Sequence, residues 1–332
     1  MVLNKWHPLE ATRLCNHVTS PAPPMDLLGT TRADSPCILY LAHGGSSYRD
    51  QAAFSLLTLH GLAPAAPIRT IVFTDVPERF AGLAHEIIDF SAAEVKADIG
   101  RFRYFYRVKI QILRRAVARF PSAVSWMLVD GDTAWSGPPD GLLDKLHQGC
   151  AVMWKEEGMV GPTFHGKLQR TLKRIRPKDS EFVMRNSGVL GIPNAGGPCA
   201  LDETLALTDE LLVQCRQRGW PEQAAFSIVL PRYYSIVYAD QTIRHYWDLN
   251  KEMADVLRLF FAGIAGLDPR AQAEAATAFD PILPARAVQL ALRQAKPQWR
   301  QRLVALRRSL EKRKIDVDAL WARYQRSRLP AP

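Results

Sequence analysis

Cysteine is scarce in this sequence of 332 residues. The five cysteines lie at positions 15, 37, 150, 199 and 215. No two of them form a Cys-x-x-Cys pair, and none clusters with histidines at the spacing of a zinc site. The pattern excludes a structural zinc motif and favours reduced thiols in a cytoplasmic protein.

Long apolar runs are also missing. The N-terminal segment MVLNKWHPLEATRLC lacks the apolar centre of a signal peptide, and charged residues interrupt every later hydrophobic stretch. If a protein with this sequence associates with a membrane, it would have to lie on the membrane surface. We therefore expect a cytoplasmic protein, with the inner face of the membrane as the alternative location.

The composition is that of a folded chain, with 47% hydrophobic and 23% charged residues. A chain of this length can bury one large core and carry an appended helical piece. Residues 1–34 are rich in Pro and Ser and predict a poorly ordered arm. We expect one α/β domain over residues 35–250 and a basic helical extension over residues 251–332.

The net charge of +10 is concentrated in that extension, where 16 Lys and Arg stand against 8 Asp and Glu. A basic surface favours a nucleotide, a nucleic acid or an anionic lipid as partner, although a solvated helix face explains it as well. Apolar and basic residues alternate at helical spacing from Trp299 to Ile315. This pattern suits a helix packed on the catalytic domain, or one that contacts an anionic membrane.

Three apolar runs, CILYLA, TIVFTD and VSWMLVDGD, are separated by helical patterns. This alternation predicts an α/β fold, a mostly parallel twisted sheet with helices on both faces. In such sheets, ligands bind beyond the carboxyl ends of the strands. His43–Tyr48, Thr74-Asp75 and Asp130-Gly131-Asp132 fall at these ends. Farther along, we expect a basic loop over residues 167–178.

Asp130 and Asp132 directly follow the third apolar run. Two carboxylates one residue apart at a strand end can converge on a hard divalent cation, Mn²⁺ or Mg²⁺. Haloacid dehalogenase phosphatases place the same pair after a strand and use one Asp as nucleophile. Their motif usually carries Thr or Val where this chain has Ala134, and it lies nearer the start of the core. That phosphatase is the alternative interpretation of the pair.

Four elements, in order, resemble the retaining glycosyltransferases of family 8, which have the GT-A fold and include glycogenin and bacterial galactosyltransferases. The resemblance covers residues 36–252. The elements are the helical segment YRVKIQILRRA with Lys109 that precedes the strand and DGD, the NSG segment Asn186-Ser187-Gly188, the EQ pair Glu222-Gln223, and His245 with Lys251 six residues later.

The resemblance implies a metal ion held by Asp130, Asp132 and His245. Such an ion would bridge the two phosphates of a nucleotide diphosphate sugar. Lys251, Arg107 and Lys109 would contact the same diphosphate.

The resemblance also implies where the rest of the donor lies. Asn186 and Ser187 would bind the donor sugar, and Glu222 and Gln223 would lie near its anomeric carbon. The nucleoside would lie against Ala42, Thr74 and Asp75. Asp248 stands where the family commonly has Gly and is a further candidate catalytic residue; it or Glu222 would be the general base if the enzyme inverted.

The sequence thus predicts a metal-dependent glycosyltransferase that acts with retention in bacterial glycoconjugate or polysaccharide synthesis. Its acceptor is a glycan, a lipid-linked molecule or a protein, and the donor sugar stays open. A nucleic-acid-binding protein would explain the basic charge but would leave the strand-end carboxylates without a role. A family member that has lost activity is a further alternative.

Overall fold

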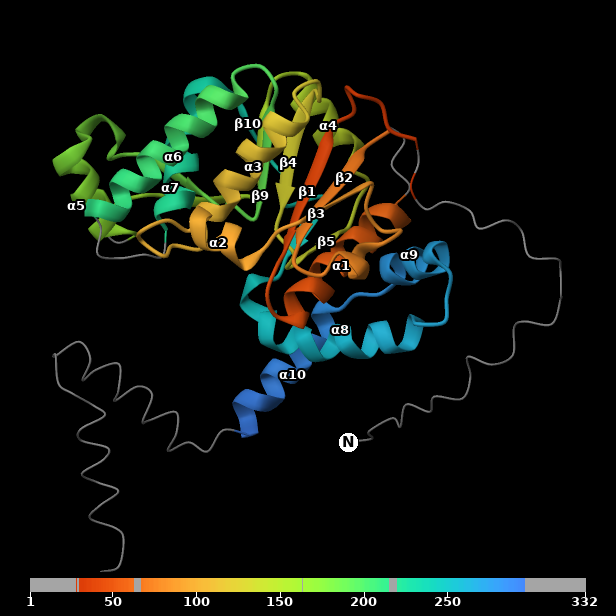
Figure 1. The fold of residues 1–332 in the computed structure, drawn as a ribbon. Coiled ribbons are helices and arrows are strands. Elements are labelled where there is room, and N and C mark those ends of the chain that lie inside the picture. The colour runs from red at the N-terminus through yellow and green to blue at the C-terminus, as the bar shows by residue number, and fades with distance from the viewer. Residues whose placement is uncertain (1–27, 29, 63–66, 163, 215–219, 296–332) are drawn as a thin grey trace, which may run out of the picture.

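The computed structural model describes residues 28, 30–62, 67–162, 164–214 and 220–295 (Figure 1). Most of the predicted N-terminal arm and the segment from Trp299 to Ile315 lie outside these ranges. Among the described helices, none combines the length and the apolar character that crossing a bilayer requires.

A seven-stranded sheet forms the centre of the described part of the chain (Figure 1). Its strands pair in parallel except β9, which runs antiparallel to both of its neighbours. The predicted α/β class and the mostly parallel sheet are confirmed. From one edge to the other, the strands are β10 (Ile236–Tyr238), β6 (Ala151–Met153), β9 (Val189–Pro193), β4 (Ser125–Val129), β1 (Cys37–Ala42), β2 (Arg69–Thr74) and β3 (Glu86–Asp89).

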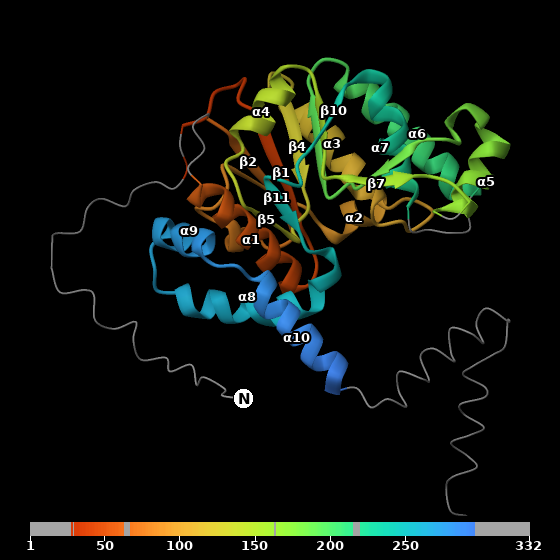
Figure 2. The same cartoon turned by 180° about the vertical axis from the view of Figure 1, so that it is seen from behind.

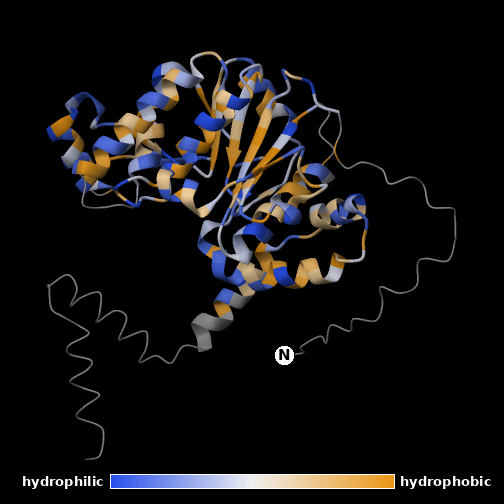
Figure 3. Cartoon of the chain, in the orientation of Figure 1, coloured by the Kyte–Doolittle hydropathy of each residue, from blue (hydrophilic) through white to orange (hydrophobic). Residues whose placement is uncertain are grey.

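Apolar side chains alternate along these strands and form two cores, one on each face of the sheet. In β1, Tyr40 belongs to one core and Leu39 to the other. Figure 3 shows the hydrophobic residues gathered in the central strands. Helices cover both faces, as predicted, because each face is apolar and must be kept from water.

The first face is covered mainly by helices from the two ends of the described domain, together with one short helix from its middle (Figure 2). The C-terminal helices share this core with α1, through residues such as Met253 and Leu257. The boundary at residue 250 stays a prediction. The helices on this face are α1 (Ser46–Gly61), α4 (Asp140–His147), α8 (Asn250–Ile264), α9 (Pro269–Ala278) and α10 (Ile282–Ala295).

The second face is covered by helices from the middle of the chain. The short α2 begins with a capping box, in which Ser91 and Glu94 exchange side-chain and backbone hydrogen bonds. These helices are α2 (Ala92–Asp98), α3 (Arg107–Arg119), α5 (Gly166–Ile175), α6 (Gly197–Gln214) and α7 (Pro221–Tyr233).

The basic loop predicted over residues 167–178 is largely wrong, because most of it is the helix α5. Its Leu168 and Leu172 lie four residues apart and are both buried in the second core. The helix also carries four exposed cations, Lys167, Arg170, Lys173 and Arg174. The segment therefore looks like a polar loop in sequence, while one apolar stripe stabilises a helix. The segment that contains α5 lies between β7 (Glu156–Met159) and β8 (Val183–Arg185), which pair to form a two-stranded ribbon.

A second small ribbon bears directly on the site. In it, β5 (Thr133–Trp135) pairs antiparallel with β11 (Ile243–His245). The Trp135 indole N–H donates a 2.9 Å hydrogen bond to the hydroxyl of Tyr40 in β1. This bond holds the ribbon against the first face of the sheet. Segments that are far apart in sequence therefore meet just beyond the end of β4.

We predict that Gly61→Ala destabilises the fold by about 1–3 kcal/mol through overpacking. A Cβ at Gly61, the last residue of α1, would overlap the backbone carbonyl of Ala273 in α9. Thermal and denaturant unfolding would measure the loss. The matched control is Gly141→Ala in α4, where a Cβ meets nothing within 4 Å; it should leave stability unchanged or raise it. Equal stabilities for the two variants would contradict the close α1–α9 packing.

Candidate active site

The carboxyl ends of β4, β1 and β2 lie side by side, because these strands are parallel neighbours in the sheet. The loops after β1 and β2 are joined by hydrogen bonds. The Thr74 hydroxyl donates to the Ala42 carbonyl at 2.8 Å, and the Gly44 amide donates to Asp75 Oδ2 at 3.2 Å. The strand-end segments singled out in the sequence therefore meet at one edge of the sheet.

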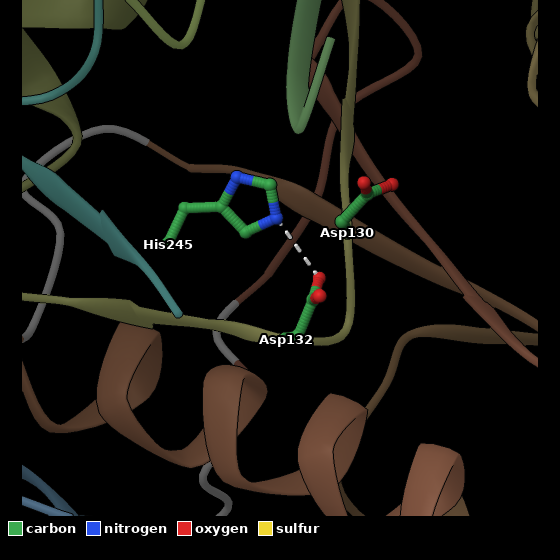
Figure 4. A group of neighbouring side chains, drawn as sticks. All are labelled: Asp130, Asp132 and His245. Atoms are coloured by element: carbon green, nitrogen blue, oxygen red, sulfur yellow. Dashed lines mark hydrogen bonds and ion pairs between the residues drawn. The ribbon is translucent and has the colours of Figure 1, made fainter. Parts of the chain in front are cut away.

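Asp130 and Asp132 follow β4, and the β5–β11 ribbon brings His245 to them. Thr133 pairs with His245, so the imidazole lies next to Asp132. His245 Nε2 is 3.1 Å from Asp132 Oδ1 (Figure 4). One ligand atom from each of the three residues lies within 4.8 Å of the others. The three predicted metal ligands thus form one cluster.

Two neighbours hold the His245 ring in place. Trp154 packs edge-on against it, with ring centroids 4.9 Å apart. Gly188 of the NSG segment lies on another side, where a Cβ would overlap the imidazole. Only glycine therefore leaves room for the ring in this position.

The residues of this cluster fit a divalent cation such as Mn²⁺ or Mg²⁺. Two carboxylates and an imidazole offer oxygen and nitrogen ligands from a single edge of the sheet. Burial alone would raise the pKa of Asp132, but His245 and a 3.1 Å hydrogen bond from Asn250 lower it. The ionised carboxylate that a metal needs is thereby favoured.

Lys109 lies in the same site, although it belongs to α3. Its ammonium is 2.6 Å from Asp130 Oδ2 and donates to the Ser187 carbonyl at 3.2 Å. The side chain is almost fully buried. Burial alone would lower the pKa of Lys109, but the charges of Asp130 and Glu222 raise it above its ordinary value. Lys109 is therefore a fixed positive charge beside the carboxylates.

Glu222, at the start of α7, is 2% exposed. Its Oε2 accepts a 3.3 Å hydrogen bond from the Ser187 hydroxyl, and its Oε1 is buried without a hydrogen-bond partner in the described part of the chain. Burial raises the pKa of Glu222 to about 7. The carboxyl group can therefore be neutral or charged near neutral pH.

Glu157, in β7, binds two of the predicted site residues. It accepts hydrogen bonds from Asn186 Nδ2 and from Gln223 Nε2, both at 2.8 Å. The side-chain oxygen of Asn186, Oδ1, in turn accepts a 2.8 Å hydrogen bond from the backbone amide of Gly188. These side chains come from three separate elements and are held rigidly together.

Two cavities meet at the cluster. One, of about 430 Å³, is lined by Leu41, His43 and the half-exposed rings of Tyr48 and Phe105. The other, of about 380 Å³, is lined by the residues around Glu157 and Glu222 and by two tryptophans, Trp220 and Trp247. Residues shared by the two cavities are Tyr106, Lys109, Asp130, Asp132 and Asn250. The metal-ligand cluster thus lies where the two cavities join.

Six of the predicted site residues lie outside both cavities, and four of these carry charged side chains. Arg107 forms an ion pair with Asp209 at 2.8 Å, on the side of α3 that faces α6. Asp248 forms an ion pair with Arg286 at 2.7 Å. Lys251 is exposed in the first turn of α8. Asp75 lies 3.6 Å from Arg49 and contacts the loop after β1 through Gly44.

The backbone near Ala42 and Thr74 is also set back from the cavities. Both residues are fully buried beneath the loops, and the neighbouring Leu41 and His43 line the larger cavity in their place. The remaining predicted residues line the smaller cavity together with the metal-ligand cluster. They are Lys109, Asn186, Ser187, Glu222 and Gln223.

Residues that the sequence analysis missed include Asn250, Glu157 and the two tryptophans. Asn250 directly precedes Lys251 in the segment that was singled out, so its proximity in sequence was a usable signal. Glu157 gave none, because its partners Asn186 and Gln223 lie 29 and 66 residues away.

No family model matches the sequence, and no curated protein matches it. The structure is similar to those of several glycosyltransferases. Mouse xyloside xylosyltransferase 1, in its apo form, has 13% identity and a TM-score of 0.42, over 61% of this chain and 84% of that chain. The galactosyltransferase LgtC with donor and acceptor sugar analogues has 12% identity and a TM-score of 0.44, over 74% and 84%.

A third structure is a glycosyltransferase involved in the glycosylation of the major capsid of PBCV-1. It has 12% identity and a TM-score of 0.41, over 68% of this chain and 99% of that chain. Similarity at this level does not assign an activity or a residue's role.

We predict that Mn²⁺ stabilises the protein through this cluster. A cation that binds only the folded state, at 100 times its dissociation constant, raises the free energy of unfolding by about 2.7 kcal/mol. Asp132→Asn should abolish the rise in melting temperature. Asp248→Asn, which removes a carboxylate outside both cavities, should retain it. Stabilisation of both variants alike would place the cation elsewhere.

We also predict a pH-dependent difference in stability between the wild type and Glu222→Gln. The pKa of Glu222 rises from 4.5 to about 7 on folding, so its protonated form stabilises the folded state below pH 4.5. That contribution is lost as pH rises to 7. The variant should therefore gain stability relative to wild type across this window, by on the order of 3 kcal/mol. Denaturant unfolding at pH 5 and pH 8 in the presence of a chelator measures it, and a difference that stays constant would contradict the assignment.

Proposed function

We propose that the protein is a metal-dependent glycosyltransferase that moves a sugar from a nucleotide diphosphate sugar to an acceptor. The observation that carries this proposal is the meeting of two cavities at Asp130 and Asp132, with Lys109 beside them and His245 in the smaller cavity. A nucleotide sugar has two ends joined by a diphosphate, and this site has two chambers joined by a cation-binding cluster. The likeness of the four sequence elements to family 8 enzymes agrees with it.

The larger cavity suits the nucleoside. Tyr48, Phe105 and Tyr106 line it with rings that are 47–55% exposed, which leaves aromatic faces free to stack on a base. His43 also lines it, and its Nε2 is buried without a hydrogen-bond partner in the described part of the chain. A donor or acceptor on the base edge would supply that partner.

The junction of the cavities suits the diphosphate. Asp130, Asp132 and His245 would hold Mn²⁺ or Mg²⁺, and when bound the ion supplies a Lewis acid that offsets the charge of the leaving diphosphate. Lys109 adds a positive charge that is already fixed by its bonds to Asp130 and the Ser187 carbonyl. A charge held in place before the reaction stabilises the transition state without reorganisation.

The smaller cavity suits the donor sugar and the end of the acceptor. Asn186, Gln223 and Glu222 present polar groups that are positioned for sugar hydroxyls. Trp220 and Trp247 line the same cavity and are partly exposed, so they can pack on the apolar face of a sugar ring and exclude water. Lys251 stays a predicted phosphate contact, and retention stays the predicted stereochemical outcome. A role in bacterial glycoconjugate synthesis, with a glycan, lipid-linked or protein acceptor, is part of the same proposal.

The second candidate function is the phosphatase that would use Asp130 as nucleophile. The Asp130–Asp132 pair is compatible with it, and a cation is needed in both cases. That activity would leave the aromatic-lined cavity and the cluster around Glu157 without a role. The glycosyltransferase accounts for both chambers and is preferred for that reason.

We predict slow, Mn²⁺-dependent hydrolysis of at least one nucleotide sugar in a panel that covers several bases and sugars. Asp132→Asn should lower the rate on the order of 100-fold, since a bound cation supplies several kcal/mol of charge stabilisation. Asp144→Asn, an exposed carboxylate on α4, should leave it unchanged. Release of nucleoside diphosphate by chromatography is the readout. Phosphate release from simple phosphoesters, with no turnover of any donor, would favour the phosphatase instead.

A further inference from the structure

The inner wall of the smaller cavity is built around Glu157. Its two carboxylate oxygens accept from Asn186 Nδ2 and Gln223 Nε2, each at 2.8 Å. Because both amide nitrogens turn toward Glu157, the carbonyl oxygen of Gln223 is directed away from it. The side-chain oxygen of Asn186, Oδ1, already accepts a hydrogen bond from the backbone amide of Gly188. Around Glu157 the wall therefore presents acceptor groups to a ligand.

Glu222 adds an acceptor that has no partner. Its side chain is 98% buried and lines this cavity, and its Oε1 has no hydrogen-bond partner in the described part of the chain. A buried carboxyl oxygen without a partner is costly. A hydroxyl group of a ligand in the cavity would satisfy it.

Positive charge does not balance these carboxylates. Among the described residues that line this cavity, Lys109 is the only Lys or Arg. Its ammonium is already bound to Asp130 and to the Ser187 carbonyl. Asp130 and Asp132 face the candidate cation site, and Lys109 also attracts Glu222. Glu157 is a carboxylate of this cavity that forms no ion pair among the described residues.

We propose that this cavity selects a donor sugar that carries hydroxyl groups and no carboxylate, and that Glu157 is the specificity-determining residue. The proposal rests on the proposed function and names its donor class. A uronic acid would bring a further carboxylate into a small, partly enclosed cavity beside Glu157, which forms no ion pair among the described residues. Like charges in such a setting repel strongly, while the hydroxyl groups of a neutral sugar can donate to the acceptors of the wall.

Binding calorimetry in the presence of Mn²⁺ tests the proposal with matched donor pairs. The pairs are UDP-glucose with UDP-glucuronate, UDP-galactose with UDP-galacturonate, and GDP-mannose with GDP-mannuronate. The members of each pair differ only in the oxidation of one carbon. For the pair whose base the protein accepts, we expect the neutral sugar to bind on the order of 100-fold more tightly than the acid.

Glu157→Gln should narrow this ratio to about tenfold or less, because it removes the nearest negative charge. Its affinity for the nucleoside diphosphate alone should stay at the wild-type value, since that part of the donor does not reach Glu157. The matched control is Glu156→Gln on the same strand. Glu156 is exposed, accepts a 3.0 Å hydrogen bond from Tyr238 and lies outside both cavities, so this variant should keep the full ratio.

The outcomes separate this inference from the function on which it rests. Equal or tighter binding of the acidic sugar by the wild type would overturn the inference and leave the glycosyltransferase standing. An unchanged ratio in a folded Glu157→Gln variant would overturn the role of Glu157. Absence of binding by every donor and every nucleoside diphosphate would overturn the proposed function itself. If the variant does not fold, the wild-type ratio alone decides the sugar class.

Discussion

The antiparallel pairing of β5 with β11 is the contact on which the site depends. It carries His245 across 113 residues of sequence to Asp132, and it does so through backbone hydrogen bonds that set the register. A shift by one residue would turn His245 to the other face of the ribbon. Trp154 and Gly188 then limit the orientation of the ring. The proposed cation site is thus assembled by strand pairing and packing rather than by a local motif.

The charges of the site are arranged around one buried lysine. Lys109 comes from a helix on the second face of the sheet, yet its ammonium lies among Asp130, Ser187 and Glu222. Removing it would leave carboxylates in a poorly solvated environment without a partner, which is costly. The same carboxylates that hold Lys109 in place also define a cation site on one side and an acceptor-lined chamber on the other. The same few charged groups therefore balance one another in the interior and take part in the proposed chemistry.

Several parts of the fold could be predicted because their signals are local. The apolar runs that became β1 and β2 were bounded within a residue, and the third run began within a residue of the start of β4, since a fully buried strand must be apolar along its length. The helix α5 was missed for the opposite reason. Its apolar stripe is short, and only contact with the second core stabilises it. Likewise, Arg107 and Lys109 are close in sequence, but α3 turns one toward Asp209 and the other into the site.

The sequence by itself determined the α/β class, the strand-end position of Asp130 and Asp132, and the set of polar segments from which a site could be built. Apolar periodicity and residue chemistry are properties of short segments, so they can be read without coordinates. Only the tertiary structure decided which of those segments meet. In the folded chain, Lys251 and Asp248 lie outside the cavities, whereas Glu157 and Asn250 line the smaller one. The reason is that helix rotation and strand register, which set the direction of each side chain, depend on packing between segments far apart in the chain.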